Sequence, residues 1–283
     1  MISRLLSKLL FWRANAPVVA MVRLKGVIAP STGGVRKSIN LETIEPLLKK
    51  AFATTGLRAV ILLINSPGGS PVQSQLIADR IRQLSAKTDT PVLAFCEDAA
   101  ASGGYWLACA ADEIYASPAS IIGSIGVVSA GFGFPDLLAK LGVERRVYTA
   151  GTSKAMLDPF KAEEPQDVAH LKSLQEQLHE QFKDYVKSRR GGRITVQDEE
   201  VYSGAFWSGS TALKLGLIDS LGTMHQVLVQ KFGEDYRLVT MQAKSGFSLL
   251  SALSSSQQNK LNDAATHLIE TVDEKAWWSR LGL

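Results

Sequence analysis

The sequence predicts an α/β fold in which helices cover a largely parallel β-sheet. Residues 58–65 (RAVILLIN) are a continuous apolar run rich in β-branched side chains, which is typical of a strand buried on both faces. Strand-like segments alternate with segments that carry apolar residues at helical spacing, as in βα units. The 283 residues, 46% of them hydrophobic and 20% charged, suit one large folded domain with extensions rather than a disordered chain.

The elements of this core are expected in a regular order. A strand over residues 18–29 (VVAMVRLKGVIA) leads into a glycine-containing loop. The helix predicted at 43–52 tolerates Pro46 because this residue falls in its first turn. The strand at 58–65 is followed by a helix at 72–84, a strand at 91–95, a helix after Ser102, a strand at 113–116 and a glycine-spaced strand at 123–134.

The second half of the chain adds helical extensions to the core. A long amphipathic helix is predicted at 167–190, then a turn-rich unit at 204–223 and a helix at 224–232. A Ser/Gln-rich stretch at 251–260 precedes a weakly amphipathic helix that ends in Trp277 and Trp278, and we expect this tail to be peripheral. The predicted organisation is an amphipathic N-terminal segment (1–16), a main domain (17–242) and a helical tail (243–283).

The N-terminal segment is basic and amphipathic. No run of about 18 apolar residues occurs in the sequence, so neither a transmembrane segment nor a clear signal peptide is predicted. Apolar residues recur at helical spacing over residues 2–11, with Arg4, Lys8 and Arg13 among or after them. This pattern leaves three interpretations open, namely peripheral membrane contact, a helix packed on the protein or its oligomer, and a degenerate export signal.

Charge and cysteine content exclude several function classes. The 31 basic and 27 acidic residues give a net charge of +4 and are spread along the chain, so a nucleic-acid partner is not expected. Cys96 and Cys109 lie in apolar segments without CxxC spacing, which favours buried thiols over a disulfide or metal ligation. No metal-ligand motif such as HExxH is present, and we expect no cofactor.

Two glycine-rich turns that follow predicted strands are candidates for a nucleophilic site. Ser102, in the run ASGGY, stands where a helix begins, and its own amide could bind an oxyanion; the alternative is that Ser102 only caps the helix. The run NSPGG ends the strand at 58–65 and could expose a second amide. A serine nucleophile needs a base, but all four histidines lie in helical patterns of the second half and are expected to be solvated.

The motifs around these turns resemble a known family. The runs INSPGG (64–69), DAAASGGYWLACAADEIYASPASIIGSIGVVS (98–129), YTAGTSKAMLDPF (148–160) and GLIDSLG (216–222) are similar to the signal peptide peptidase A family, the S49 serine peptidases. The resemblance implies that Ser102 is the nucleophile, Lys154 its general base and Ser124 an auxiliary serine that hydrogen-bonds the lysine. It also implies an oxyanion hole at Gly69 with Gly68 beside it, completed by the amide region of Ser102 or Gly103.

The same resemblance implies a crotonase/Clp-like fold and a ring-like homo-oligomer in which neighbouring protomers share each active site. It implies a peptide or protein substrate, such as signal peptides or other unstructured peptides released from membranes. The expected location is bacterial, either cytoplasmic or peripheral at the inner membrane.

Two other functions remain open from the sequence. A crotonase-like enzyme acting on acyl-CoA thioesters would need an acidic residue in the site, and Glu97 and Asp98 are the near candidates. A catalytically silent scaffold bound to membrane surfaces would use the ring and the amphipathic start alone.

Overall fold

The computed structural model describes residues 16–31, 38–242 and 275–283, so the expected amphipathic segment and most of the tail lie outside the described residues. The strands are β1 (Val18–Lys25), β2 (Leu57–Ser66), β3 (Val92–Ala101), β4 (Glu113–Ala116), β5 (Ile121–Gly123), β6 (Phe206–Ser208), β7 (Ser220–Leu221) and β8 (Arg237–Met241). The helices are α2 (Leu41–Phe52), α3 (Pro71–Thr88), α4 (Gly103–Ala108), α5 (Pro135–Lys140), α6 (Pro165–Arg190), α7 (Asp198–Val201), α8 (Gly209–Lys214) and α9 (Met224–Phe232).

One mixed sheet organises the fold. Its main path runs β6-β5-β3-β2-β1-β8, and β4 and β7 extend it from the first part of β3. All pairings are parallel except that of β5 with β6. The long strand β3 changes partner along its length, because residues 93–96 pair with β4 and residues 99–101 with β5. The sheet therefore divides along β3, with β4 beside its first part and β5 beside its last three residues, and Ser102 follows directly after them.

The two faces of the sheet are both covered, as the run RAVILLIN predicted. In β2, Val60, Leu62 and Ile64 face the larger core, which α2, α3, α4 and the end of α6 complete. The alternate residues Ala59, Ile61 and Leu63 face a second core closed by α9. This alternation is the two-residue period of a strand, and both sets are apolar because neither face meets water.

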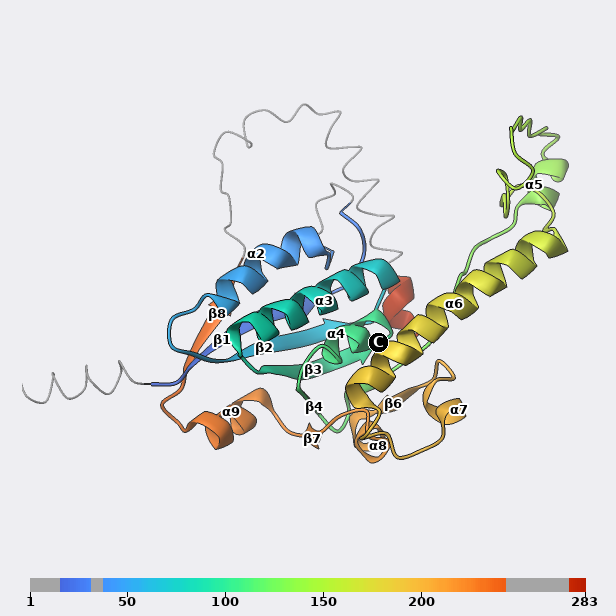
Figure 1. The fold of residues 1–283 in the computed structure, drawn as a ribbon. Coiled ribbons are helices and arrows are strands. Elements are labelled where there is room, and N and C mark those ends of the chain that lie inside the picture. The colour runs from blue at the N-terminus through green and yellow to red at the C-terminus, as the bar shows by residue number, and fades with distance from the viewer. Residues whose placement is uncertain (1–15, 32–37, 243–274) are drawn as a thin grey trace, which may run out of the picture.

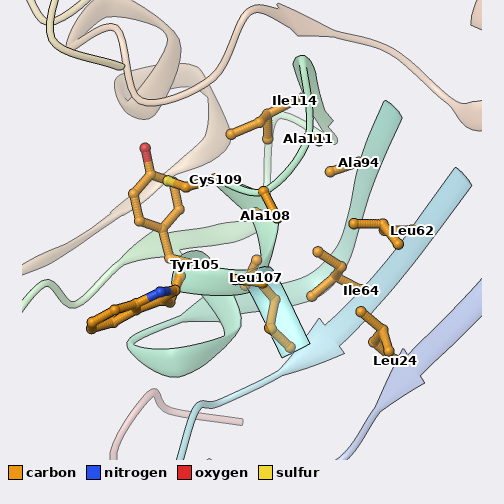
Figure 2. Close-up of a cluster of buried hydrophobic side chains, with 14 of the residues drawn as sticks. Leu24, Leu62, Ile64, Ala94, Tyr105, Leu107, Ala108, Cys109, Ala111 and Ile114 are labelled. Carbon is orange, nitrogen blue, oxygen red and sulfur yellow. The ribbon is translucent and has the colours of Figure 1, made fainter. Parts of the chain in front are cut away.

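Helix α4 is held by deep packing against the middle of the sheet. Figure 2 shows Leu107 beside Ile64 and Leu24, with Ala108 turned toward Leu62 and Ala94. All six residues of α4 are buried. Ser102, which immediately precedes α4, is therefore positioned by one of the most enclosed parts of the molecule.

The expected fold class is confirmed, and most predicted elements are present with shifts of a few residues. The predicted strand over 123–134 is wrong, because the chain leaves the sheet after Gly123 and continues without regular structure to α5. Ser124 has a φ of 54°, and Gly126 approaches the backbone of Gly204, so a regular strand cannot continue there. Strand β8, which adds to the edge of the sheet beside β1, was not predicted from the sequence.

Helix α6 links the core to a projecting arm, residues 127–164. At the C-terminal end of α6, Phe182 and Val186 are buried, and the ring of Phe182 stacks on Trp106 of α4 with centroids 4.7 Å apart. The N-terminal end extends beyond the sheet and meets the arm, which contains α5 (Figure 1). No residue of α5 is buried.

Candidate active site

Ser102 lies at a strained junction between β3 and α4. Its backbone has φ 51° and ψ −123°, a region that residues other than glycine rarely occupy. The conformation is fixed because the Ser102 amide donates to the Gly123 carbonyl at 2.7 Å and the Ser102 carbonyl accepts from the amides of Tyr105 and Trp106. The Ser102 side chain makes no capping hydrogen bond to α4, so a helix-capping role does not account for this serine. Strain of this kind is concentrated at functional sites.

The turn after β2 packs directly on this junction. Gly68 and Gly69 both have positive φ values, 107° and 139°. A Cβ on Gly68 would lie 2.7 Å from the Ser102 Cβ, and one on Gly69 would lie 2.0 Å from the Ile28 carbonyl oxygen. Only glycine fits at either position, and this close approach brings the backbone of the turn against the serine.

The amides around Ser102 divide into engaged and available donors. The Ser102 amide is engaged with Gly123, so the expectation that it could serve as an oxyanion donor is wrong. The Gly68 amide donates to Ser66 Oγ at 3.2 Å. Among the described residues, no hydrogen bond joins the amide of Gly69 or Gly103 to another group, and an ideal Cβ on Gly103 would lie 3.4 Å from the Gly69 nitrogen. These two neighbouring amides are the donors that a substrate oxygen could use.

Ser124 stands on a loop fixed from three sides. The preceding Gly123 carbonyl accepts from the Ser102 amide, the Ser124 amide donates to the Ala205 carbonyl at 2.7 Å, and the Ile125 carbonyl accepts from His179 Nε2 at 3.0 Å. The loop is thus attached to the Ser102 junction, to the segment before β6 and to α6. This arrangement places Ser124 in the same cavity as Ser102.

The cavity has a volume of about 450 Å³ and draws its walls from distant parts of the chain. Of the residues expected in one site, Ser102, Ser124 and Gly69 line it, whereas Gly68 and Gly103 do not. Helix α6 and the C-terminal residues provide walls that sequence reasoning did not assign: Lys172, Gln175, Glu176, His179, Trp277, Arg280 and Leu281.

The C-terminal residues 275–283 are not peripheral. Residues 275–279 form a short helix, and Leu281 is only 8% exposed because it packs with Trp278 against Ala99 and Ala101 of β3. Residues 275–283 therefore close one side of the cavity that contains Ser102.

His179 is the second unforeseen wall residue. The expectation of solvated histidines is met by His170 and His225, which are exposed, and His267 lies outside the described residues. His179 is half-buried and lies three and seven residues before Phe182 and Val186, on the face of α6 that packs on the core. That helical spacing was the available signal in the sequence.

Lys154 is not brought to Ser102 within the chain. It is exposed, lies in the turns between α5 and α6, and does not line the cavity. The amide of the nearby Leu157 donates to Asp167 at the start of α6. Asp167 precedes His179 by about three helical turns, roughly 18 Å along the axis. The Lys154 loop thus belongs to the projecting arm, away from the cavity of its own chain.

The acidic residues of the acyl-CoA alternative also lie outside the cavity. Neither Glu97 nor Asp98 lines it. Asp98 instead accepts a hydrogen bond of 2.6 Å from the side-chain amide of Asn65. The one carboxylate among the described residues that line the cavity is that of Glu176 on α6, so neither acidic residue named for this alternative is in place.

Metal and thiol chemistry find no support in the described part of the chain. No group of three or more His, Cys, Asp or Glu side chains there could hold a metal ion. Cys96 and Cys109 are both free and buried, and burial raises the pKa of Cys109 to about 12. Nor is any described helix both long enough and apolar enough to cross a bilayer.

Comparisons with known proteins identify the family of this chain. The model of peptidase family S49 matches residues 85–234. A putative protease of Synechocystis is 33% identical over 206 residues, which are 72% of this chain and 70% of that protein. A putative signal peptide peptidase SppA of Enterococcus faecium is 31% identical over 219 residues, 76% of this chain and 63% of the relative.

A longer relative has a different name. The Na(+)/H(+) antiporter NhaA of Brucella melitensis is 46% identical over 279 residues, which cover 96% of this chain but 38% of the antiporter. That name describes a protein of which the chain matches little more than a third.

Solved structures share the fold. A serine-to-alanine mutant of the 1510-N membrane-bound stomatin-specific protease covers 81% of this chain with a TM-score of 0.51 at 17% identity. A lysine-to-alanine mutant of the same protease, in complex with a substrate peptide, covers 84% of this chain with a TM-score of 0.53 at 18% identity.

Proposed function

The chain belongs to peptidase family S49, and on this premise we propose that it is a serine endopeptidase with Ser102 as nucleophile and Lys154 as general base. The observation that carries the proposal is the junction at Ser102. A serine with φ 51° faces a cavity beside two available amides, those of Gly69 and Gly103. This arrangement suits attack on a carbonyl group whose oxygen becomes negatively charged.

The proposed reaction is acyl transfer in two steps. Ser102 Oγ attacks the carbonyl carbon of the peptide bond while its proton passes to the neutral amine of Lys154. The Gly69 and Gly103 amides donate to the oxyanion. The C–N bond then breaks as the lysine ammonium returns the proton to the leaving nitrogen. Water, deprotonated in turn by the lysine, attacks the acyl-enzyme ester. The bond between the acyl carbon and Ser102 Oγ then breaks as the lysine ammonium returns the proton to Oγ, which releases the acid and restores the serine and the neutral lysine.

We place Lys154 in the active site of a neighbouring protomer. Its position on the arm, outside the cavity of its own chain, supports this arrangement. In general a lysine in water is protonated at neutral pH, and burial in an apolar environment favours the neutral amine that a base requires. Docking of the arm on a second copy would supply that burial, and Ser124 would then accept or donate a hydrogen bond at the amine.

The surface of the arm supports docking of this kind. Eight of the fourteen large hydrophobic side chains that the described structure exposes fall within residues 128–160. They are Val128, Phe132, Phe134, Leu137, Leu141, Val143, Tyr148 and Phe160. Apolar surface concentrated on one projecting segment is typical of an interaction site. Since the same segment carries the proposed base, the occupant that fits is another copy of this chain, and a closed ring would bring each arm to a neighbour.

The proposed substrates are signal peptides or other unstructured peptides released from membranes. The cavity lies between α6, the Ser124 loop and the C-terminal residues, and we propose that a peptide enters it in an extended form. The relative named as a putative signal peptide peptidase supports this substrate class. We propose that residues 17–242 form the peptidase domain, with 1–16 as an amphipathic segment in peripheral contact with the inner membrane.

The test is cleavage of an unstructured protein and of a short fluorogenic peptide. Ser102→Ala and Lys154→Ala should each abolish cleavage, and Lys161→Ala, a change at an exposed lysine of the same arm, should retain it. A serine-reactive probe should label the wild type and not Ser102→Ala. Full activity of either dyad variant would refute the assignment. Removal of residues 1–13 should weaken binding to anionic liposomes, and unchanged binding would refute the membrane role of that segment.

A further inference from the structure

We infer that His179 is a positioning residue that holds the Ser124 loop against α6 and thereby sets the catalytic rate. The inference rests on the proposed function, because it concerns the serine assigned there to the lysine. His179 Nε2 lies 3.0 Å from the Ile125 carbonyl oxygen, one residue after Ser124, and both His179 and Ser124 line the cavity of Ser102.

The chemistry of the contact fixes the role of the imidazole. A carbonyl oxygen only accepts, so Nε2 must carry the hydrogen and donate. The Nε2–H is present both in this neutral tautomer and in the imidazolium, so the hydrogen bond persists when the ring is protonated. This hydrogen bond to the Ile125 carbonyl also occupies Nε2, which is then unable to accept the proton of Ser102.

The position of His179 on α6 makes the contact a rigid one. Phe182 and Val186, on the same face, are 3% and 0% exposed and anchor the helix to the core. An apolar side chain would continue this stripe; the imidazole instead reaches across to a loop that has no regular structure. The backbone of that loop is strained at Ser124, with φ 54°, so it needs external contacts to keep its shape.

Helix α6 therefore contacts two proposed catalytic segments, the Ser124 loop of its own cavity and the Lys154 loop that would serve a neighbouring protomer. Through His179 it holds the Ser124 loop, and through Asp167 it accepts a hydrogen bond from Leu157 in the loop that carries Lys154. Loss of the His179 contact would leave the Ser102 junction in place, because its backbone is bonded to Gly123, Tyr105 and Trp106. The turn at Gly69 would also stay in place, because its neighbours Gly68 and Ser70 are bonded to Ile28. The defect should thus appear at proton transfer and not at substrate binding.

The experiment compares two substitutions at one position. In His179→Gln the side-chain amide nitrogen stands about as far from the backbone as Nε2 and can donate to Ile125, whereas His179→Leu keeps the volume and removes the donor. We expect kcat to fall about 10- to 100-fold in His179→Leu with KM within about threefold of wild type, since small misplacements have effects of this size. His179→Gln should stay within about threefold of wild type, and His170→Leu, an exposed control on the same helix, should be unchanged.

A double substitution tests whether His179 acts through Ser124. In the Ser124→Ala background, His179→Leu should cause no further loss, because the loop then has no serine to position. Additive losses, or wild-type kcat in a folded His179→Leu protein, would overturn this inference alone. A His179→Gln variant as inactive as His179→Leu, with the acidic limb of the pH profile lost, would instead make His179 the general base. Full activity of Ser124→Ala would overturn both the role of Ser124 and this inference.

Discussion

A methyl group added at Gly103 tests one proposed donor of the oxyanion site, the Gly103 amide. A Cβ there would lie 2.4 Å from Ser74 Oγ, 3.1 Å from Ile28 Cδ1 and 3.4 Å from the Gly69 nitrogen. Ser74 is fully buried and its hydroxyl donates to the Ser70 carbonyl at 2.9 Å, so the side chain cannot simply swing away. The start of α4 must shift instead, and the Gly103 amide moves with it. Loss of one such donor typically lowers kcat by about 100- to 1000-fold, or roughly 3–4 kcal/mol in transition-state stabilisation.

The assay is steady-state cleavage of a fluorogenic peptide, with thermal unfolding as a check on the fold. Gly103→Ala should lower kcat by about 100-fold or more and leave KM within about threefold. Because Ser74 Oγ is the nearest obstacle, adding Ser74→Ala should restore part of the lost activity. Gly192→Ala, where a Cβ would meet nothing within 4 Å, is the control and should behave as wild type. A folded Gly103→Ala protein with wild-type kcat would refute the assignment of this amide.

Three further outcomes follow from the same structure. Ser102→Gly should be inactive but more stable by about 1 kcal/mol in the free energy of unfolding, because glycine relieves the positive φ; an unchanged melting temperature would contradict the strain. Arg190→Leu should lower that free energy by about 3–5 kcal/mol. The Arg190 side chain is 2% exposed and lies 2.7 Å from the Asp219 carboxylate, so the substitution removes the main partner of a largely buried charge. The half-exposed Arg193→Leu, also beside Asp219, should lower it by no more than about 1 kcal/mol, and equal effects in chemical denaturation would refute the argument. Burial raises the pKa of Cys109 to about 12, so its thiol is protonated at pH 8 and should react with iodoacetamide only after denaturation; labelling of the native protein, read by mass spectrometry, would contradict this.

The parts of the fold that local patterns determine were predictable from the sequence. Strand β2 is apolar on both faces. Helix α6 has apolar residues at helical spacing over a long segment and basic residues in its last turn. Strand β8 was missed because its five residues, Arg237–Met241, alternate only weakly and become a strand by pairing with β1. The error at residues 123–134 has a similar cause: apolar residues follow the glycines there, but the arm they enter is exposed and not part of the sheet.

The candidate site was predictable to the extent that motifs determine backbone shape. Gly68 and Gly69 are required by close contacts with Ser102 and Ile28, and Ser102 stands between β3 and α4 as the motif suggested. The sequence could not show that the Ser102 amide is engaged by Gly123, since that bond joins β5 to the end of β3. The place of Leu281 in the wall of the cavity depends likewise on contacts between residues far apart in the chain.

The central claim is that one protomer supplies Ser102 and its neighbour supplies Lys154. Its most direct test is to unfold, mix and refold equal amounts of Ser102→Ala and Lys154→Ala, each inactive alone, and to measure cleavage of the fluorogenic peptide. Random assembly pairs an intact serine with an intact neighbouring lysine at about one site in four, so the mixture should regain about a quarter of the wild-type activity per site. Mixed oligomers that form and remain inactive would contradict the claim, because they would show that both residues must come from the same chain.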